Sequence, residues 1–341
     1  MKLNMKNWAN EIITAKDRRN LPVLFFPCLK NIGMGVIESV QDGEKMAEAM
    51  AEVIREYPDT IAAITGMDLT VDSEAFGATV KFSKRQAPAV RNAVLKGKDD
   101  IYALEIPDTA AGRQEVVLDA VRRAGQNPII GERPVFGGML GPFSLAANLL
   151  EMSSALIMSR REPETMEILL DKATEFLINR AMMFKKNGAN GVFIAEPTAG
   201  LLSPADCDRL SSVYVRKIAE AVQDDSFFLI LHNCGNVANC VESMVSTGCK
   251  GLHFGNSVDM CEVTAQIPNN ILVFGNIDPS ADFFLGTPDT VYSKTMALLE
   301  KTADYPHFVL SSGCDLAPSV SNENIQAYYQ ACRDYNHGIK A

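Results

Sequence analysis

The sequence lacks any uncharged apolar run long enough to cross a membrane as a helix. Its first 20 residues carry charges throughout and contain no apolar segment of the kind that a signal peptide needs. A basic excess is also lacking, since the formal net charge is -10 and nucleic-acid phosphates require a basic face. We therefore expect a cytoplasmic protein that binds neither membranes nor nucleic acid.

Internal repeats, low-complexity tracts and an interdomain linker are missing as well. The composition, 47% hydrophobic and 22% charged, is ordinary for a globular protein, and 341 residues fit one large barrel domain. Eight cysteines occur without an export signal, so a reducing environment is expected to keep them as free thiols. Core packing, metal binding or catalysis is therefore expected of them rather than disulfide formation.

Short apolar runs, most of them stopped by Gly, Pro, Asn or Asp, predict eight β-strands. The runs are 23–27, 61–65, 134–140, 191–195, 227–231, 251–254, 271–274 and 308–310. Helical patterns lie between several of them, as at 42–57 and from Pro163 to Gly188. Alternating strands and helices, with strands apolar on both faces, predict an α/β fold of the (β/α)8 TIM-barrel type. An open, doubly wound sheet is the alternative.

We expect one domain over residues 1–341. Within it, residues 1–20 are predicted to form an N-terminal helical extension, and 77–127 an insertion followed by a crossover helix. The glycine-rich stretch "FGGMLG" at 136–141 lacks both the dinucleotide fingerprint and the Lys-Ser/Thr of a P-loop. It therefore predicts a tight strand-to-helix turn.

The stretch "LHNCGN" at 231–236 places His232 and Cys234 two residues apart at the end of the fifth predicted strand. Side chains at i and i+2 of a strand share one face, and barrel sites are built at this end of the strands. Cys314, in "LSSGCDLAP", follows the eighth strand and supplies a third ligand. Three ligands leave the fourth position of a Zn²⁺ ion open, as in catalytic sites.

Two thiolates weaken zinc as an acid for water but suit it to holding a substrate thiol as thiolate. Alkyl transfer to sulfur is then the natural reaction. The alternative is that both cysteines and His232 are ordinary core residues, and the residues alone leave both interpretations open. No metal role is expected for His253, His307 or His337.

Several motifs together resemble the uroporphyrinogen decarboxylase superfamily: "LHNCGN", "FGNIDPS", "LSSGCDLAP", "GLLSPAD" and "GMDLTVDSEAFGA". The His-x-Cys with a distant Cys is similar to the methylcobamide:coenzyme M methyltransferase branch. The resemblance implies a (β/α)8 barrel in which His232, Cys234 and Cys314 bind Zn²⁺. It also implies transfer of a methyl group from a methylcobamide, carried by a corrinoid protein, to a thiol such as coenzyme M or to a folate.

Other polar residues at predicted strand ends are candidates for the site. Glu196 is expected as a fourth ligand or as an acid/base, with capping of the next helix or binding of a backbone N–H as the alternative. In position, Asp68 resembles the essential aspartate of the decarboxylase, and it is a second catalytic candidate. Asn256, Asn276 and Asp278 are candidates for substrate binding, although the last two can equally fix a turn.

Two other functions are compatible with the resemblance. One is a metal-independent decarboxylase-like enzyme, but "FFPCLKNIGMGVIES" has no arginine where the decarboxylase binds the propionates of its porphyrinogen. The other is a non-catalytic module that binds a corrinoid protein. A cobalamin motif Asp-x-His-x-x-Gly fails at Ile230, so the cobamide is expected to arrive on a separate protein.

Overall fold

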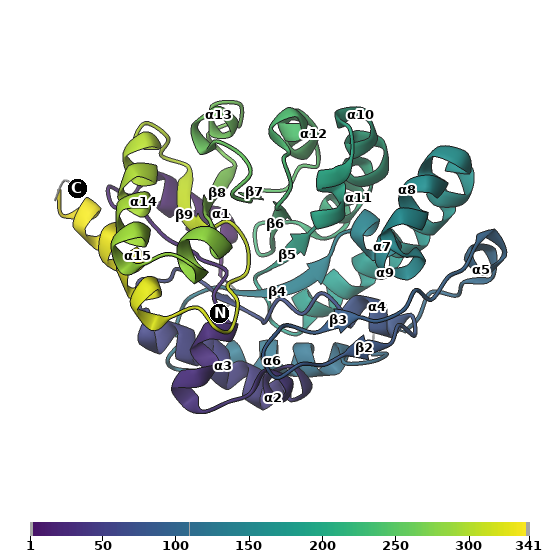
Figure 1. Cartoon of the computed structure of the whole chain (residues 1–341), viewed down its shortest axis with the longest axis horizontal. Helices are drawn as coiled ribbons and strands as arrows, with labels where there is room; N and C mark the ends of the chain where they lie inside the picture. The colour runs from purple at the N-terminus through teal and green to yellow at the C-terminus, as the bar shows by residue number, and fades with distance from the viewer. Residues whose placement is uncertain (1–2, 109, 339–341) are drawn as a thin grey trace.

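The computed structural model describes residues 3–108 and 110–338, so residues 1 and 2 of the predicted extension and 109 of the predicted insertion lie outside it. Seven strands form one parallel sheet in the order β1-β4-β5-β6-β7-β8-β9. They are β1 (Ala63–Ile64), β4 (Val135–Leu140), β5 (Gly191–Ala195), β6 (Phe228–Asn233), β7 (Gly251–Phe254), β8 (Leu272–Ile277) and β9 (Phe308–Ser312). The sheet curls, with helices around it (Figure 1).

The two edges of this sheet meet at a single residue. Asn20 pairs in parallel with Thr60, just before β1, and with Leu310 in β9. The predicted strand at 23–27 is therefore wrong, because no ladder extends through these residues. Pro22 lacks the N–H that a ladder needs, which explains why the pairing stops after one or two residues.

Helices connect the strands and cover the outer face of the sheet. They are α1 (Met5–Thr14), α2 (Val36–Gln41), α3 (Gly43–Glu56), α4 (Val71–Ala75), α5 (Lys98–Ala103), α6 (Gln114–Ala124), α7 (Pro142–Leu150), α8 (Met152–Arg161), α9 (Pro163–Lys186), α10 (Pro204–Cys207), α11 (Val213–Val222), α12 (Val241–Ser246), α13 (Met260–Thr264), α14 (Pro288–Lys301) and α15 (Asn322–Asn336). Short helical turns are η1 (Phe26–Ile32), η2 (Pro197–Leu201), η3 (Asp208–Ser212), η4 (Ala238–Cys240) and η5 (Pro279–Phe284). No described helix has the length and apolar character needed to span a membrane.

The helices begin and end where the sequence provides caps. The predicted helix at 42–57 is present as α3, and Asp42 caps it by accepting hydrogen bonds from the backbone of Glu44 and Lys45. The helix predicted from Pro163 is α9, and Gly188, with φ of 97°, takes the left-handed conformation just beyond it.

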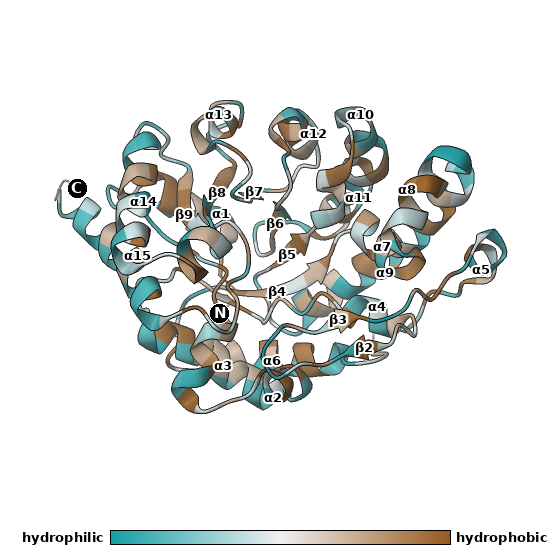
Figure 2. Ribbon diagram, viewed as in Figure 1, coloured by the Kyte–Doolittle hydropathy of each residue, from teal (hydrophilic) through white to brown (hydrophobic). Residues whose placement is uncertain are grey.

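Apolar side chains fill both the interior of the sheet and the layer between sheet and helices. Figure 2 shows hydrophobic strands at the centre and hydrophilic outward faces on the helices. At the amino-terminal end of the strands, Trp8 of α1 packs its ring against Phe136 and Phe228, with centroids 5.9 and 5.5 Å away. This end is filled by side chains, so chemistry is expected at the opposite, carboxyl end.

The segment between β1 and β4 supplies a wall of that opposite end. It contains a small antiparallel hairpin, β2 (Val80–Lys81) with β3 (Ala89–Val90), followed by α5 and α6. Figure 1 shows the hairpin and α5 running outward beside α4. Residues 87 and 88, at the start of the returning strand, line the cavity described next.

Candidate metal centre

A cavity of about 240 Å³ opens at the carboxyl ends of the strands. Phe193 and Ala195 of β5 and His232 of β6 form its floor, and loop residues complete it. The residues that line it are Val23, Met67, Leu69, Ala87, Pro88, Phe193, Ala195, Pro197, His232, Cys234, Cys314 and Asp315.

The structure brings His232, Cys234 and Cys314 together in this cavity. His232 is the second-last residue of β6, and Cys234 follows this strand directly. Cys314 lies two residues beyond the end of β9. Their ligand atoms all lie within 4.8 Å of one another. Cys314 Sγ is 3.7 Å from His232 Nε2, close to the roughly 3.6 Å expected of two ligands on one tetrahedral zinc ion. The three residues fit Zn²⁺ in both donor type and spacing.

The two thiols are unequal. A hydrogen bond with Cys314, and then one with His232, lowers the pKa of Cys234, although burial opposes the shift. The same bond with Cys234, together with burial, raises the pKa of Cys314. Cys234 is therefore the readier thiolate, and a divalent ion that binds here displaces the proton of the other thiol.

A chain of hydrogen bonds fixes the tautomer of His232. Ser311 Oγ donates to the carbonyl of Leu21 at 2.7 Å and therefore accepts from His253 Nε2 at 2.9 Å. Burial, and then the proximity of the His232 ring, hold the pKa of His253 well below the usual value, which favours its neutral form. Its Nδ1 then accepts from His232 Nδ1 at 2.7 Å, which leaves the Nε2 lone pair of His232 facing Cys314.

Replacing His253 with phenylalanine is expected to weaken zinc binding by about 10- to 100-fold, because the partner that orients His232 is lost. Competition with a chromophoric chelator measures this affinity. The matched control is His307→Phe, which alters another buried histidine at the start of β9 and should leave zinc affinity unchanged. Equal affinity in the two variants would contradict the positioning role.

Glu196, the first residue after β5, does not line the cavity. Its buried carboxylate accepts from the backbone N–H of Phe143 and Ser144 at 3.0 and 2.9 Å and from the hydroxyls of Ser144 and Ser211 at 2.7 and 3.2 Å. Burial raises the pKa of Glu196, and these hydrogen bonds oppose the shift. The contacts are those of a cap on the first turn of α7, which precedes Glu196 in the chain, so the carboxylate binds backbone N–H groups but does not cap the next helix as expected.

Glu196→Gln is expected to lower the free energy of unfolding by about 1–3 kcal/mol. The reason is that the new amide NH2 group would face N–H and O–H groups that donate hydrogen bonds to the carboxylate in the parent protein. Zinc content should stay at the parental value. Urea unfolding and metal analysis check the two statements, with the exposed Glu175→Gln as the control substitution. Loss of zinc with unchanged stability would instead favour the role of Glu196 as a ligand.

Asp68 lies beside the cavity but turns away from it, although Met67 and Leu69 line the wall. One carboxylate oxygen accepts from the N–H and hydroxyl of Thr70 at 3.0 and 2.6 Å, and the other forms an ion pair with Arg113. Arg113 also binds Glu74 at 2.8 Å. Both oxygens of Asp68 are therefore occupied in holding the loop after β1.

The structure also brings together Asn256, Asn276 and Asp278, but outside the cavity lining. Asn256 donates to Asp278 at 2.6 Å, and Asp278 caps η5 by accepting from two backbone N–H groups. Asn276 donates to the carbonyls of Gly255 and Val258 at 2.8 and 2.9 Å. These contacts fix the loops after β7 and β8.

Three glycines let the ligand-bearing loops touch backbone to backbone. A Cβ added to Gly235 would lie 2.5 Å from Cα of Gly200, in the loop after β5. A Cβ added to Gly255, after β7, would lie 2.6 Å from Cα of Cys234. Any side chain at these positions would displace the loop that carries Cys234.

Sequence reasoning missed two groups at the cavity. His253 was assigned no part in the metal site, yet it faces His232 across the β6–β7 pairing, where the two residues are in register. Asp315 was passed over although it follows Cys314. Its Oδ1 is buried without a hydrogen-bond partner among the described residues, and burial raises its pKa well above the usual range.

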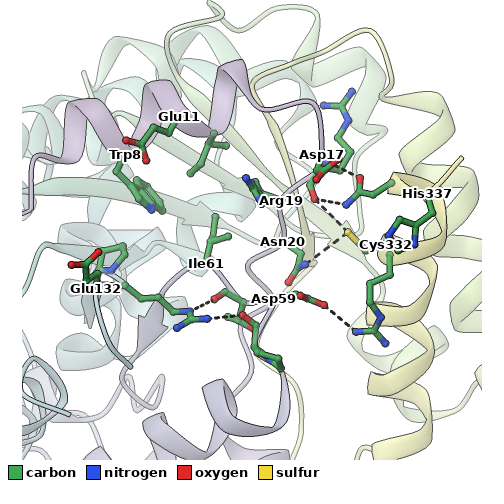
Figure 3. A pocket seen from close by; sticks show the side chains of 18 residues that line it. Trp8, Glu11, Asp17, Arg19, Asn20, Asp59, Ile61, Glu132, Cys332 and His337 are labelled. Atoms are coloured by element: carbon green, nitrogen blue, oxygen red, sulfur yellow. Dashed lines mark hydrogen bonds and ion pairs between the residues drawn. The ribbon is translucent and has the colours of Figure 1, made fainter. Parts of the chain in front are cut away.

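A second cavity, of about 630 Å³, opens at the other end of the strands (Figure 3). Its lining includes Trp8, Arg19 and Asn20, and Figure 3 shows side chains of both charges around it. Arg133 donates to the carbonyls of Thr60 and Pro58 at 2.9 and 2.6 Å, and so fastens the start of β1. Contacts of this kind at the amino-terminal end of strands serve stability.

A curled parallel sheet, consistent with a TIM-like barrel, carries at the carboxyl ends of its strands a His-Cys-Cys cluster that could hold a metal ion. The family model described as uroporphyrinogen decarboxylase (URO-D) matches residues 26–335, and the chain belongs to this family.

Known relatives and structures agree with this assignment. The chain is 29% identical over 303 residues to the methylcobamide:CoM methyltransferase MtbA of Methanosarcina acetivorans, covering 88% of this chain and 87% of the relative. It is 24% identical over 307 residues to a uroporphyrinogen decarboxylase of Pseudoalteromonas translucida, covering 87% and 84%. A methyltransferase structure from Methanosarcina mazei superposes with a TM-score of 0.87 at 24% identity, covering 98% and 99%. The predicted resemblance to the superfamily and its methyltransferase branch is confirmed.

Proposed function

We propose that this protein is a zinc-dependent methyltransferase that moves a methyl group from a methylated cobamide, carried by a corrinoid protein, to a thiol. The observation that carries the proposal is the cluster of His232, Cys234 and Cys314 in the cavity at the carboxyl ends of the strands. The methylcobamide:CoM methyltransferase relatives support the same reaction class. The proposal includes a closed (β/α)8 barrel. In this barrel the residues around Asn20, which pair with both edges of the seven-stranded sheet, take the place of the eighth strand.

Zinc held by these three residues would supply the Lewis acidity that keeps an acceptor thiol deprotonated at neutral pH. The chain's own residues prepare for this. His253 directs the free lone pair of His232 into the cavity, and the apolar walls built by Phe193, Met67 and Leu69 exclude water from the acceptor sulfur. The acceptor gains an S–C bond as the cobalt–carbon bond breaks with its electron pair left on cobalt, and the thiol proton goes to solvent.

Porphyrinogen decarboxylation is the second candidate, because uroporphyrinogen decarboxylases are also among the relatives. The contacts of Asp68 weigh against it. Both oxygens of this carboxylate are bound by Thr70 and Arg113, and the side chain does not line the cavity. A group in this state is poorly placed to meet a substrate in the cavity.

The test is methyl transfer by the zinc-loaded protein from free methylcobalamin to a panel of small thiols, followed by the loss of methylcobalamin absorbance. Methylation of at least one thiol, abolished by a zinc chelator and restored by zinc, is expected. Turnover of a porphyrinogen, with no methyl transfer to any thiol at about one zinc per chain, would overturn the proposal in favour of the decarboxylase.

A further inference from the structure

The walls around the metal cluster offer no positive charge to a bound molecule. None of the twelve described residues that line the cavity is lysine or arginine. Apart from the cluster and Asp315, the lining consists of aliphatic, aromatic and proline side chains. A small thiol seated on the cluster would therefore project its remaining atoms against apolar surface.

Three cations on segments that contribute to or support this wall are engaged or exposed. Arg113 is buried in its ion pairs with Asp68 and Glu74. Lys84 and Arg85 belong to the hairpin that contributes Ala87 and Pro88 to the wall, but both are exposed and neither lines the cavity. Exposed charges of this kind are screened by water and salt.

Two helix N-termini at this end of the fold are also occupied by side chains. The N-terminal amides of α7 are filled by the carboxylate of Glu196, and those of η5 by Asp278. Asp315 adds a carboxyl group to the cavity wall, and its Oδ1 has no partner among the described residues. An anionic tail would lose its hydration here and gain no counter-charge.

We infer that the acceptor is an uncharged, small thiol, and not a thiol that carries a sulfonate or carboxylate tail. The unpartnered Oδ1 of Asp315 suits a hydroxyl or amide donor on that thiol. The inference rests on the proposed function for the identity of the reacting group. The inference itself concerns the part of the acceptor beyond its thiol, which the apolar walls and Asp315 would select.

The experiment compares two thiols of equal length, 2-mercaptoethanol and 2-mercaptoethanesulfonate, at matched thiolate concentration with zinc-loaded full-length protein and free methylcobalamin. The kcat/KM for 2-mercaptoethanol is expected to exceed that for the sulfonate by about 100-fold, the scale on which an unpaired charge is rejected by an apolar pocket. Ethanethiol, which lacks the hydroxyl, should fall between them. Equal or inverted values for the first two thiols would overturn the inference.

A cation introduced into the wall should reverse the preference in part. Ala87→Lys, at a partly buried lining position, is expected to raise kcat/KM for the sulfonate by about tenfold. The control, Ala89→Lys, lies on β3 outside the lining and should not change the ratio. No gain from Ala87→Lys, or the same gain from Ala89→Lys, would count against selection by the wall.

A binding measurement separates this inference from the proposed function. Calorimetric titration with the methylated products, 2-(methylthio)ethanol and 2-(methylthio)ethanesulfonate, needs no turnover. Tighter binding of the uncharged product supports the inference, and tighter or equal binding of the sulfonate overturns it. If no thiol is methylated, the proposed function fails while the titration still decides which tail the cavity accepts.

Discussion

Replacing Cys314 with serine is expected to remove most of the zinc and to lower methyl transfer by at least about 100-fold. The physical reason is the loss of one of three donor atoms from a cluster that spans no more than 4.8 Å. A serine hydroxyl keeps its proton at neutral pH and is a poor ligand for zinc, so only His232 and Cys234 would remain.

Elemental analysis of protein purified without added metal, beside a methylcobalamin assay, measures both effects. The matched control is Cys261→Ser, because Cys261 lies on α13 away from the cavity and donates only to the carbonyl of Lys301. That variant should keep about one zinc per chain. A Cys314→Ser protein with full zinc content and full activity would refute the three-ligand site.

Replacing Asp72 with asparagine is expected to lower the free energy of unfolding by about 3–5 kcal/mol, the largest effect on stability that we predict. Asp72 Oδ1 lies 2.9 Å from Nε of Arg180, and both side chains are buried. Asparagine can still accept the hydrogen bond that Asp72 Oδ2 accepts from the backbone of Leu140. The variant therefore leaves the guanidinium of Arg180 buried without a counter-charge, and it also loses the weaker hydrogen bond that Asp72 Oδ1 accepts from Gln114 Nε2 at 3.4 Å.

Urea denaturation measures this change, and an exposed ion pair provides the control. Asp171→Asn removes the partner of Lys217, which lies 2.6 Å away at the surface, and should cost less than about 1 kcal/mol. Adding Arg180→Met to Asp72→Asn should recover much of the loss, since the unpaired charge is then gone. A single Asp72→Asn variant as stable as the control would show that the pair contributes little.

The sequence predicted most of the sheet because its strands are buried on both faces and read as continuous apolar runs. Seven of the eight runs correspond to the strands of the ladder. The first failed because apolar character at 23–27 reports burial, whereas strand pairing also needs free N–H groups, and Pro22 interrupts them. The small hairpin of β2 and β3 was not predicted, because its two-residue strands are too short to show an alternation of apolar and polar residues.

The site was predictable only where local geometry decided it. The spacing of His232 and Cys234 follows from the two-residue period of a strand, and Cys314 from its place after the last strand. The partner of His232 depends on the register between β6 and β7, which one chain segment does not encode. The ion pair of Asp68 with Arg113 and the hydrogen bond of Glu196 with Phe143 join residues 45 and 53 positions apart, which local patterns do not reveal.

The glycines around Cys234 set a limit on how this centre can be altered. Because Gly235 and Gly255 leave the loops in direct main-chain contact, a single methyl group at either position would move a ligand before it touched any reacting molecule. The tolerance of the centre to substitution is thus lowest at residues that have no functional group. Substitutions intended to change specificity are better placed next to the β2–β3 hairpin. There, Ala87 and Pro88 line the cavity, and changes to them would not disturb the metal ligands.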